Sequence, residues 1–178
     1  MKKFAYYVFT LLISFTLSFA GDNPKPLGLE MGSATISDAK AKYNLKYKGI
    51  NKYTLGDMYG INSSELNIEG LQDITLIFDK DKKLQAVLME FPKNFNHTYW
   101  RRLYNSLRNK YTLKSSNIPF VGDRYAIFEQ GNSIIRLESP HLGFKTYLIY
   151  MTKKFRRLYN QKNEEERRNK QRSLENNL

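Results

Sequence analysis

Trp100–Tyr125, with the sequence WRRLYNSLRNKYTLKSSNIPFVGDRY, contains two short motifs that also occur earlier in the chain, in the same order. Lys110–Lys114 (KYTLK) matches Lys42–Lys46 (KYNLK) at an offset of 68 residues. Gly122–Tyr125 (GDRY) matches Gly56–Tyr59 (GDMY) at an offset of 66 residues. Such spacing is typical of an internal duplication, and we predict one structural unit that occurs twice. Because lysine and tyrosine are abundant in this chain, a chance match is the alternative interpretation.

Each motif pair accompanies an expected helix that is followed by expected strands. The first helix is expected at residues 36–43, with Thr35 or Ser37 as its cap. The second helix is expected to start at a cap formed by Asn96 or Thr98. Its buried face is predicted from apolar side chains at helical spacing: Trp100, Leu103, Tyr104, Leu107 and Tyr111.

The strands after each helix favour hairpins, because β-branched and aromatic runs flank polar connections. Two hairpins are expected, at residues 73–91 and 125–138. We therefore predict an α+β fold with two tandem repeats of a helix followed by antiparallel strands, in a mostly antiparallel sheet. Repeat one spans about residues 27–92 and repeat two about residues 95–151.

Residues 1–20 have the parts of a secretory signal peptide. Met1–Lys3 is basic, Phe4–Phe19 is apolar but short for a membrane span, and Ser18 and Ala20 are small residues before a break. We predict cleavage after Ala20, and an uncleaved anchor is the alternative. The chain contains no cysteine, so we expect no lipobox anchor, disulfide or thiolate metal site. Residues 21–151 are predicted to form a single domain that is periplasmic or secreted.

The formal net charge is +12, and residues 152–178 hold nine Lys/Arg against four Asp/Glu. This segment is predicted to be a basic C-terminal helix or tail. It is the expected place for contact with an anionic membrane or cell-wall surface, and export argues against nucleic acid as a partner. The candidate binding residues in the segment are Lys153, Lys154, Arg156 and Arg157.

Phe155 and Tyr159 can dock the start of this C-terminal segment on the body. From Gln161 to Ser173 the segment has no apolar residue, which predicts a solvated, fraying helix. The spacings of Glu164 to Arg168 and of Glu166 to Lys170 predict two ion pairs along the helix.

Groups for catalysis are few. The chain has two histidines, His97 and His141, and neither has a carboxylate at a spacing that would build a catalytic or zinc site. Ser37–Lys40 has the Ser-x-x-Lys spacing, but the companion motifs are missing, and a capping serine explains it. We therefore predict a protein that is not an enzyme and has no cofactor or bound metal. A small hydrolase built from dispersed carboxylates is the alternative.

The repeated Gly-Asp-x-Tyr motif has two interpretations. Gly56 and Gly122 can make equivalent turns that lead into strands. Alternatively, the candidate residues of the two motifs line one pseudo-symmetric binding surface, because tyrosine supplies contact area at low entropic cost. These candidates are Asp57, Tyr59, Asp123 and Tyr125.

The segment Leu29–Gly32 leading into a helix at residues 35–43, within a duplicated helix-plus-strands unit, resembles the β-lactamase-inhibitor-protein-like architecture and the outer-membrane-assembly lipoprotein domains. The resemblance implies a non-catalytic binding or inhibitory module that uses a concave sheet. The absence of cysteine departs from members that have a lipid anchor or disulfides.

Together these features predict an exported, non-catalytic binding module that binds or inhibits another envelope or secreted protein, as immunity proteins and inhibitors do. The alternative is a peripheral envelope factor held to anionic lipid or cell-wall polymer by its basic C-terminal tail.

Overall fold

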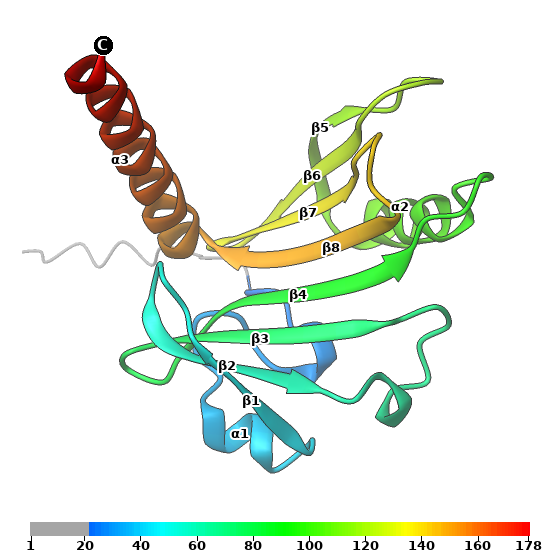
Figure 1. The fold of residues 1–178 in the computed structure, drawn as a ribbon. Coiled ribbons are helices and arrows are strands. Elements are labelled where there is room, and N and C mark those ends of the chain that lie inside the picture. The colour runs from blue at the N-terminus through cyan, green and yellow to red at the C-terminus, as the bar shows by residue number, and fades with distance from the viewer. Residues whose placement is uncertain (1–21) are drawn as a thin grey trace, which may run out of the picture.

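The computed structural model of the chain describes residues 22–178. The predicted signal peptide, residues 1–20, lies outside the described residues. The described chain has the predicted α+β class and contains one eight-stranded antiparallel sheet (Figure 1). Its elements in chain order are the 3-10 turn η1 (Pro26–Gly28), α1 (Ile36–Lys40), β1 (Leu45–Ile50), β2 (Leu55–Ile61), the 3-10 turn η2 (Ser63–Glu65), β3 (Asp73–Asp79), β4 (Leu84–Pro92), α2 (Thr98–Lys110), β5 (Thr112–Asn117), β6 (Arg124–Gln130), β7 (Ser133–Ser139), β8 (Lys145–Thr152) and α3 (Lys153–Asn177).

The strands lie in the order β1-β2-β3-β4-β8-β7-β6-β5. Strands β1 to β4 form one meander, preceded by α1, and strands β5 to β8 form another, preceded by α2. The two meanders meet where β4 pairs with β8, with Leu88 opposite Ile149. Both Lys-Tyr-x-Leu-Lys motifs lie where a helix is followed by a strand: residues 42–46 lead into β1 and residues 110–114 into β5.

One face of the sheet, called here the helix face, packs against α1, α2 and the N-terminal segment in a single core. Trp100 of α2 is 2% exposed and stacks on Tyr104, with ring centroids 4.9 Å apart. Phe78 and Phe128 are fully buried beneath the helices. The periodic apolar residues of α2 therefore face the core, as its sequence pattern predicted.

The predicted start and Thr35 cap of α1 are confirmed, whereas its end and the cap of α2 differ from the prediction. Helix α1 ends at Lys40 and is capped by Thr35, whose hydroxyl accepts the Asp38 N–H at 3.2 Å while the Asp38 carboxylate accepts the Thr35 N–H at 2.7 Å. The predicted α2 caps were wrong: the N-cap is His97, in a left-handed conformation with φ 49°. The Asn94 side chain accepts the Thr98 N–H at 2.8 Å and so satisfies one free amide of the first turn.

The two Gly-Asp pairs occupy different environments. Gly56 lies within β2, and a Cβ added there would lie 2.4 Å from the carbonyl oxygen of Phe78. Gly122 lies in the β5–β6 connection with φ +123°, a conformation that favours glycine. The prediction that they form equivalent turns is therefore wrong: close packing requires Gly56, whereas backbone conformation favours Gly122.

Helix α3 starts directly at the end of β8 and projects from the body (Figure 1). It is continuous over 25 residues, about 37 Å. Thr152 caps it by accepting the Phe155 N–H at 3.0 Å. The predicted Glu164–Arg168 pair is confirmed at 3.9 Å, but the predicted Glu166–Lys170 pair was wrong. Glu166 instead pairs with Lys52 of the β1–β2 turn at 3.0 Å. The hydrogen bond from Lys52 holds the pKa of Glu166 below its usual value.

The buried carboxylate of Asp79 connects the β3–β4 hairpin to α3. Its Oδ2 accepts hydrogen bonds from Lys154 at 2.9 Å and Gln85 at 3.0 Å, and its Oδ1 accepts the N–H groups of Asp81 and Lys83. Burial raises the pKa of Asp79, but the hydrogen bonds outweigh burial and the net pKa lies below its ordinary value. The carboxylate therefore stabilises the fold while it is ionised.

Replacing Asp79 with alanine leaves these donors unpaired at a buried position, so we expect Asp79→Ala to lower the free energy of unfolding by about 2–4 kcal/mol at pH 7. Because the folded pKa lies below the unfolded value of about 3.9, this stabilisation is present above that pH and disappears as the pH falls through the folded pKa. Urea denaturation at several pH values measures both effects.

Asp81→Ala is the matched control, because the exposed Asp81 side chain accepts no hydrogen bond in the described part of the chain. We expect it to change stability by less than about 0.5 kcal/mol. Equal losses in the two variants would contradict the role assigned to Asp79.

Candidate functional site

Within residues 22–178, the face of the sheet opposite α1 and α2, called here the open face, carries no helix except the base of α3. A groove of about 410 Å³, the open-face groove, lies between this face and the base of α3. Its floor comes from β3, β4 and β8, and its wall from α3 and the β1–β2 turn. The floor residues are Ile77, Ala86, Leu88, Ile149 and Met151.

Strand register explains the apolar floor. Ile77 lies opposite Ala86, Ala86 opposite Met151, and Leu88 opposite Ile149. Side chains directly opposite in neighbouring strands share a face of the sheet, so these residues form a continuous apolar strip across the middle of the open face. The central strands are therefore apolar on both faces, and only one of these faces is covered by α1 and α2.

The wall of the groove is aromatic. Phe155 and Tyr159, one turn apart on α3, both contact Tyr53 of the β1–β2 turn, with ring centroids 5.9 Å and 4.9 Å apart. Phe155 is buried, whereas Tyr159 is 44% exposed and leaves its outer edge at the rim. These aromatic contacts and the Lys52–Glu166 pair set the angle at which α3 leaves the sheet.

Two arginines supply the positive charge of the groove. Arg136 of β7 pairs with Glu138 two residues along the same strand, and its guanidinium lies 6.0 Å from the ring centroid of Tyr125. Arg156 of α3 lines the groove and has no salt bridge within residues 22–178. Among the charged side chains of the groove, Arg156 is thus the one available to an anionic group from a partner.

The structure does not bring the four candidates from the repeated motif together. Tyr125 lies on the open face beside Arg136, but Tyr59 lies on the helix face, where its ring contacts Phe78 at a centroid distance of 6.1 Å. Burial raises the pKa of Tyr59, in keeping with that position. Asp57 lies in β2 opposite Ile50 of the edge strand. Asp123 lies in the β5–β6 connection, where its carboxylate accepts a backbone N–H.

The structure also places the four basic candidates of residues 153–157 in different environments. Lys153 pairs with Glu129 at 3.6 Å and Lys154 with Asp79 at 2.9 Å, so both are engaged within the fold. Arg157 is exposed on α3, next to Arg156 of the groove but not among the residues that line it.

Most residues that line the groove were not predicted from the sequence. Arg136 and Glu138 alternate with the buried Ile135 and Leu137 along β7, a two-faced pattern that could have indicated a strand with one partly polar face. Tyr53 gave no comparable signal, because its aromatic partners are more than 100 residues away in the chain.

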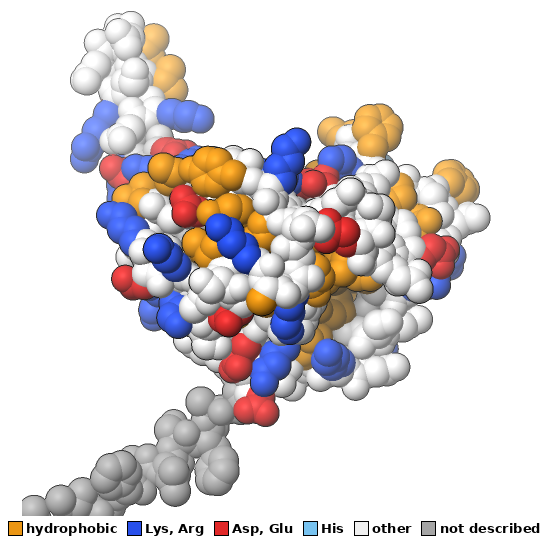
Figure 2. Space-filling model, turned by 90° about the horizontal axis from the view of Figure 1, so that it is seen from below, with side chains coloured by type: hydrophobic (Ala, Val, Ile, Leu, Met, Phe, Trp, Pro, Cys, Tyr) orange, Lys and Arg blue, Asp and Glu red, His pale blue; other side chains and the backbone are white. Residues whose placement is uncertain are grey.

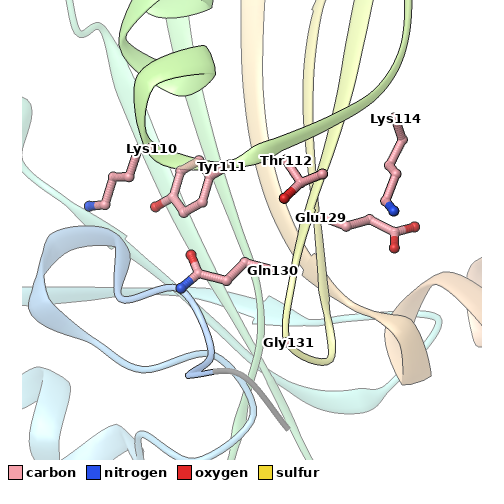
Figure 3. A pocket seen from close by; sticks show the side chains of 7 residues that line it. All are labelled: Lys110, Tyr111, Thr112, Lys114, Glu129, Gln130 and Gly131. Atoms are coloured by element: carbon pink, nitrogen blue, oxygen red, sulfur yellow. The ribbon is translucent and has the colours of Figure 1, made fainter. Parts of the chain in front are cut away.

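A second recess, of about 460 Å³, lies where α2 meets β5 beside the β6–β7 turn (Figure 3). Lys110, Lys114 and Glu129 project around it, and Glu129 is already paired with Lys153. It is shallow and polar, and we assign no chemistry to it.

Within residues 22–178, no group of three or more His, Asp or Glu is placed to hold a metal ion. None of the helices in this range is long and apolar enough to cross a membrane.

No protein-family model matches the chain, and no curated protein matches it. Among solved structures, the chain is similar to a DUF4309 family protein, YjgB, from Bacillus subtilis subsp. subtilis str. 168. The two are 14% identical, with 76% of this chain and 91% of that chain covered and a TM-score of 0.43. This is a partial likeness of shape.

The aromatic contacts of Tyr53 with Phe155 and Tyr159 of α3 can be tested by mutation. Because aromatic pairs each contribute about 0.5–1.5 kcal/mol beyond burial, we expect Tyr53→Ala to destabilise the protein by about 1–3 kcal/mol. We also expect faster amide hydrogen exchange at residues 155–166, measured by mass spectrometry. Tyr47→Ala is the control, because Tyr47 contacts Tyr59 on the helix face. Unchanged hydrogen exchange at residues 155–166 in Tyr53→Ala would contradict the claim that Tyr53 holds the base of α3 in place.

Proposed function

We propose that the protein is an exported, non-catalytic binding module of the immunity or inhibitor type, which holds a segment of another envelope or secreted protein in its open-face groove. The composition of residues 1–20 supports export. The binding role is supported above all by Arg156, which lines an apolar groove on the sheet face opposite α1 and α2 and has no salt bridge within residues 22–178.

The groove has the composition of a binding hot spot. Aromatic residues and arginine dominate the energetics of protein interfaces, where an apolar centre excludes water from a few polar contacts. Here the apolar strip forms the centre, while Tyr53, Tyr159 and Arg156 surround it. Apolar area contributes about 25 cal/mol per Å² when removed from water, so a side chain that covers Leu88 and Ile149 would contribute to binding.

The chemistry of the groove defines the partner segment. An aliphatic or aromatic side chain fits the floor, and a carboxylate placed beside it can accept two hydrogen bonds from the Arg156 guanidinium. Without the two lysines of residues 1–20 the net charge is +10, which favours acidic partners at long range. The expected partner is therefore an acidic protein with an exposed apolar anchor.

We also infer that the two meanders are tandem repeats. In support, each meander has four strands preceded by a helix, the meanders meet at the β4–β8 pair, and both Lys-Tyr-x-Leu-Lys motifs lie at a helix-to-strand junction. The open face between such repeats would resemble the concave sheet of the inhibitor-like architecture.

A second candidate function is attachment to anionic lipid or cell-wall polymer through α3. Glu166 is the last residue of α3 with a salt bridge to the rest of the described chain, and beyond it the helix carries four exposed basic residues and one acidic one. We expect a chain ending at Glu166 to lose binding to anionic vesicles if this candidate holds, because polybasic attraction gives about 1 kcal/mol per basic residue. Vesicle binding that is insensitive to salt would contradict it.

Affinity capture tests the first candidate. Protein comprising residues 21–178 and tagged at its N-terminus is incubated with an envelope fraction, and the retained proteins are identified. We expect Arg156→Glu to weaken capture of a specific partner at least about tenfold, because the new carboxylate repels the acidic segment.

Arg157→Glu is the matched control, since it makes the same charge change at the next residue of α3, outside the groove. Capture should persist in this variant. Equal capture by wild type and both variants would show that the open-face groove is not the binding surface.

A further inference from the structure

Three loops at one end of the sheet carry apolar side chains that are almost fully exposed. They are the β4–α2 loop (93–97), the β5–β6 loop (118–123) and the β7–β8 loop (140–144). Five apolar side chains on these loops form what we call the loop-tip cluster. Their exposed fractions are Phe95 98%, Phe120 96%, Leu142 91%, Phe144 90% and Val121 66%. Single exposed apolar residues are ordinary, but several gathered on neighbouring loops mark an interaction site.

The loops are fixed to one another, so the cluster is one surface. The Lys93 N–H donates to the Phe144 carbonyl at 2.9 Å, and the Lys93 Nζ donates to the carbonyls of Pro140 and His141 at 2.6 Å and 2.8 Å. The His141 N–H donates to the Asp123 carboxylate at 2.6 Å. These bonds connect all three loops around a hollow of about 700 Å³ lined by Phe95, Phe120 and Phe144.

The hollow is positively charged. Lys93, Arg101 and Arg124 line it, and none of its lining residues in the described chain is acidic. His97 also lines it, with a buried Nδ1 that has no hydrogen-bond partner within residues 22–178. Burial and the nearby Arg124, Lys93 and Arg101 lower the pKa of His97, as expected in a positive field.

We propose that the loop-tip cluster anchors the protein to an anionic lipid bilayer, with its phenylalanines at the boundary between headgroups and acyl chains and its basic side chains on lipid phosphates. The side chains lie at the tips of three loops and are 66–98% exposed, so a flat lipid surface can reach all of them at once. Aromatic rings favour the membrane interface, and cationic residues beside them attract anionic lipid. Figure 2 shows hydrophobic side chains standing out from the body on the side away from α3.

This surface is separate from the open-face groove. Strand β8 runs from Lys145, directly after Phe144, to Thr152, where α3 begins. The strand spans about 25 Å, so the base of α3 and the loop tips lie at opposite ends of it. A bilayer that contacts the loops would therefore leave the groove open to a partner, and this proposal does not depend on the proposed function.

Vesicle co-sedimentation tests the proposal with protein comprising residues 21–178. The vesicles contain either phosphatidylcholine alone or phosphatidylcholine with about one third phosphatidylglycerol. We expect stronger binding to the anionic vesicles, and a loss of at least about tenfold in the triple variant Phe95→Ser, Phe120→Ser and Phe144→Ser. Arg101→Glu should weaken binding to anionic vesicles, whereas Arg157→Glu should change it less.

Leu174→Ser is the matched control, because Leu174 is an exposed apolar residue of α3, far along the chain from the loops. It should bind as wild type does, and so should a chain ending at Glu166. Unchanged binding by the triple variant, or binding lost only with residues 167–178, would overturn the proposal. If the wild-type protein does not bind the vesicles, the proposal is also overturned, and the cluster would then be a surface for a protein partner.

A second readout does not depend on the triple variant remaining folded. Phe144→Trp places an indole at a loop tip, while the native Trp100 is 2% exposed and gives a constant background. We expect a blue shift of the added emission with anionic vesicles, together with quenching by brominated lipid. Emission that is unchanged by anionic vesicles would contradict insertion.

Discussion

The antiparallel pairing of β4 with β8 holds the two halves of the chain together in one sheet and positions α3 beside it. Seven residue pairs, from Ala86–Met151 to Pro92–Lys145, join two four-stranded meanders into one sheet. Both strands are apolar on both faces: Val87 and Leu148 enter the core beneath the helices, while Leu88 and Ile149 form the floor of the open-face groove. Because α3 begins where β8 ends, the same pairing positions the wall of the groove above its floor.

Local patterns predicted the elements that local forces determine. The helical spacing of apolar residues around Trp100 located α2, and the polar connection after Phe78 located the β3–β4 hairpin. The α+β class followed from the order of helices and strands. The capping group of α1 was also visible, because Thr35 and Asp38 have the spacing at which each satisfies the other's backbone amide.

Contacts between distant segments were not visible in the sequence. Glu166 was expected to pair along its own helix, but Lys52, in a turn more than 100 residues earlier, lies closer to it. Gly56 was taken for a turn residue, although close approach of the β3 backbone is what requires glycine there. Tyr59 and Tyr125 occupy matching motifs, yet they face opposite sides of the sheet, which no motif match can reveal. The groove and the loop-tip cluster both depend on such long-range placement.

Methyl NMR of the protein with and without a captured partner can show whether the partner binds at the open-face groove. We expect addition of the partner to shift the methyl signals of Ile77, Leu88 and Ile149, which line the groove. The signals of Ile74 and Ile135, fully buried on the helix face, should remain in place. Shifts confined to other surfaces, with Leu88 and Ile149 unchanged, would contradict the account.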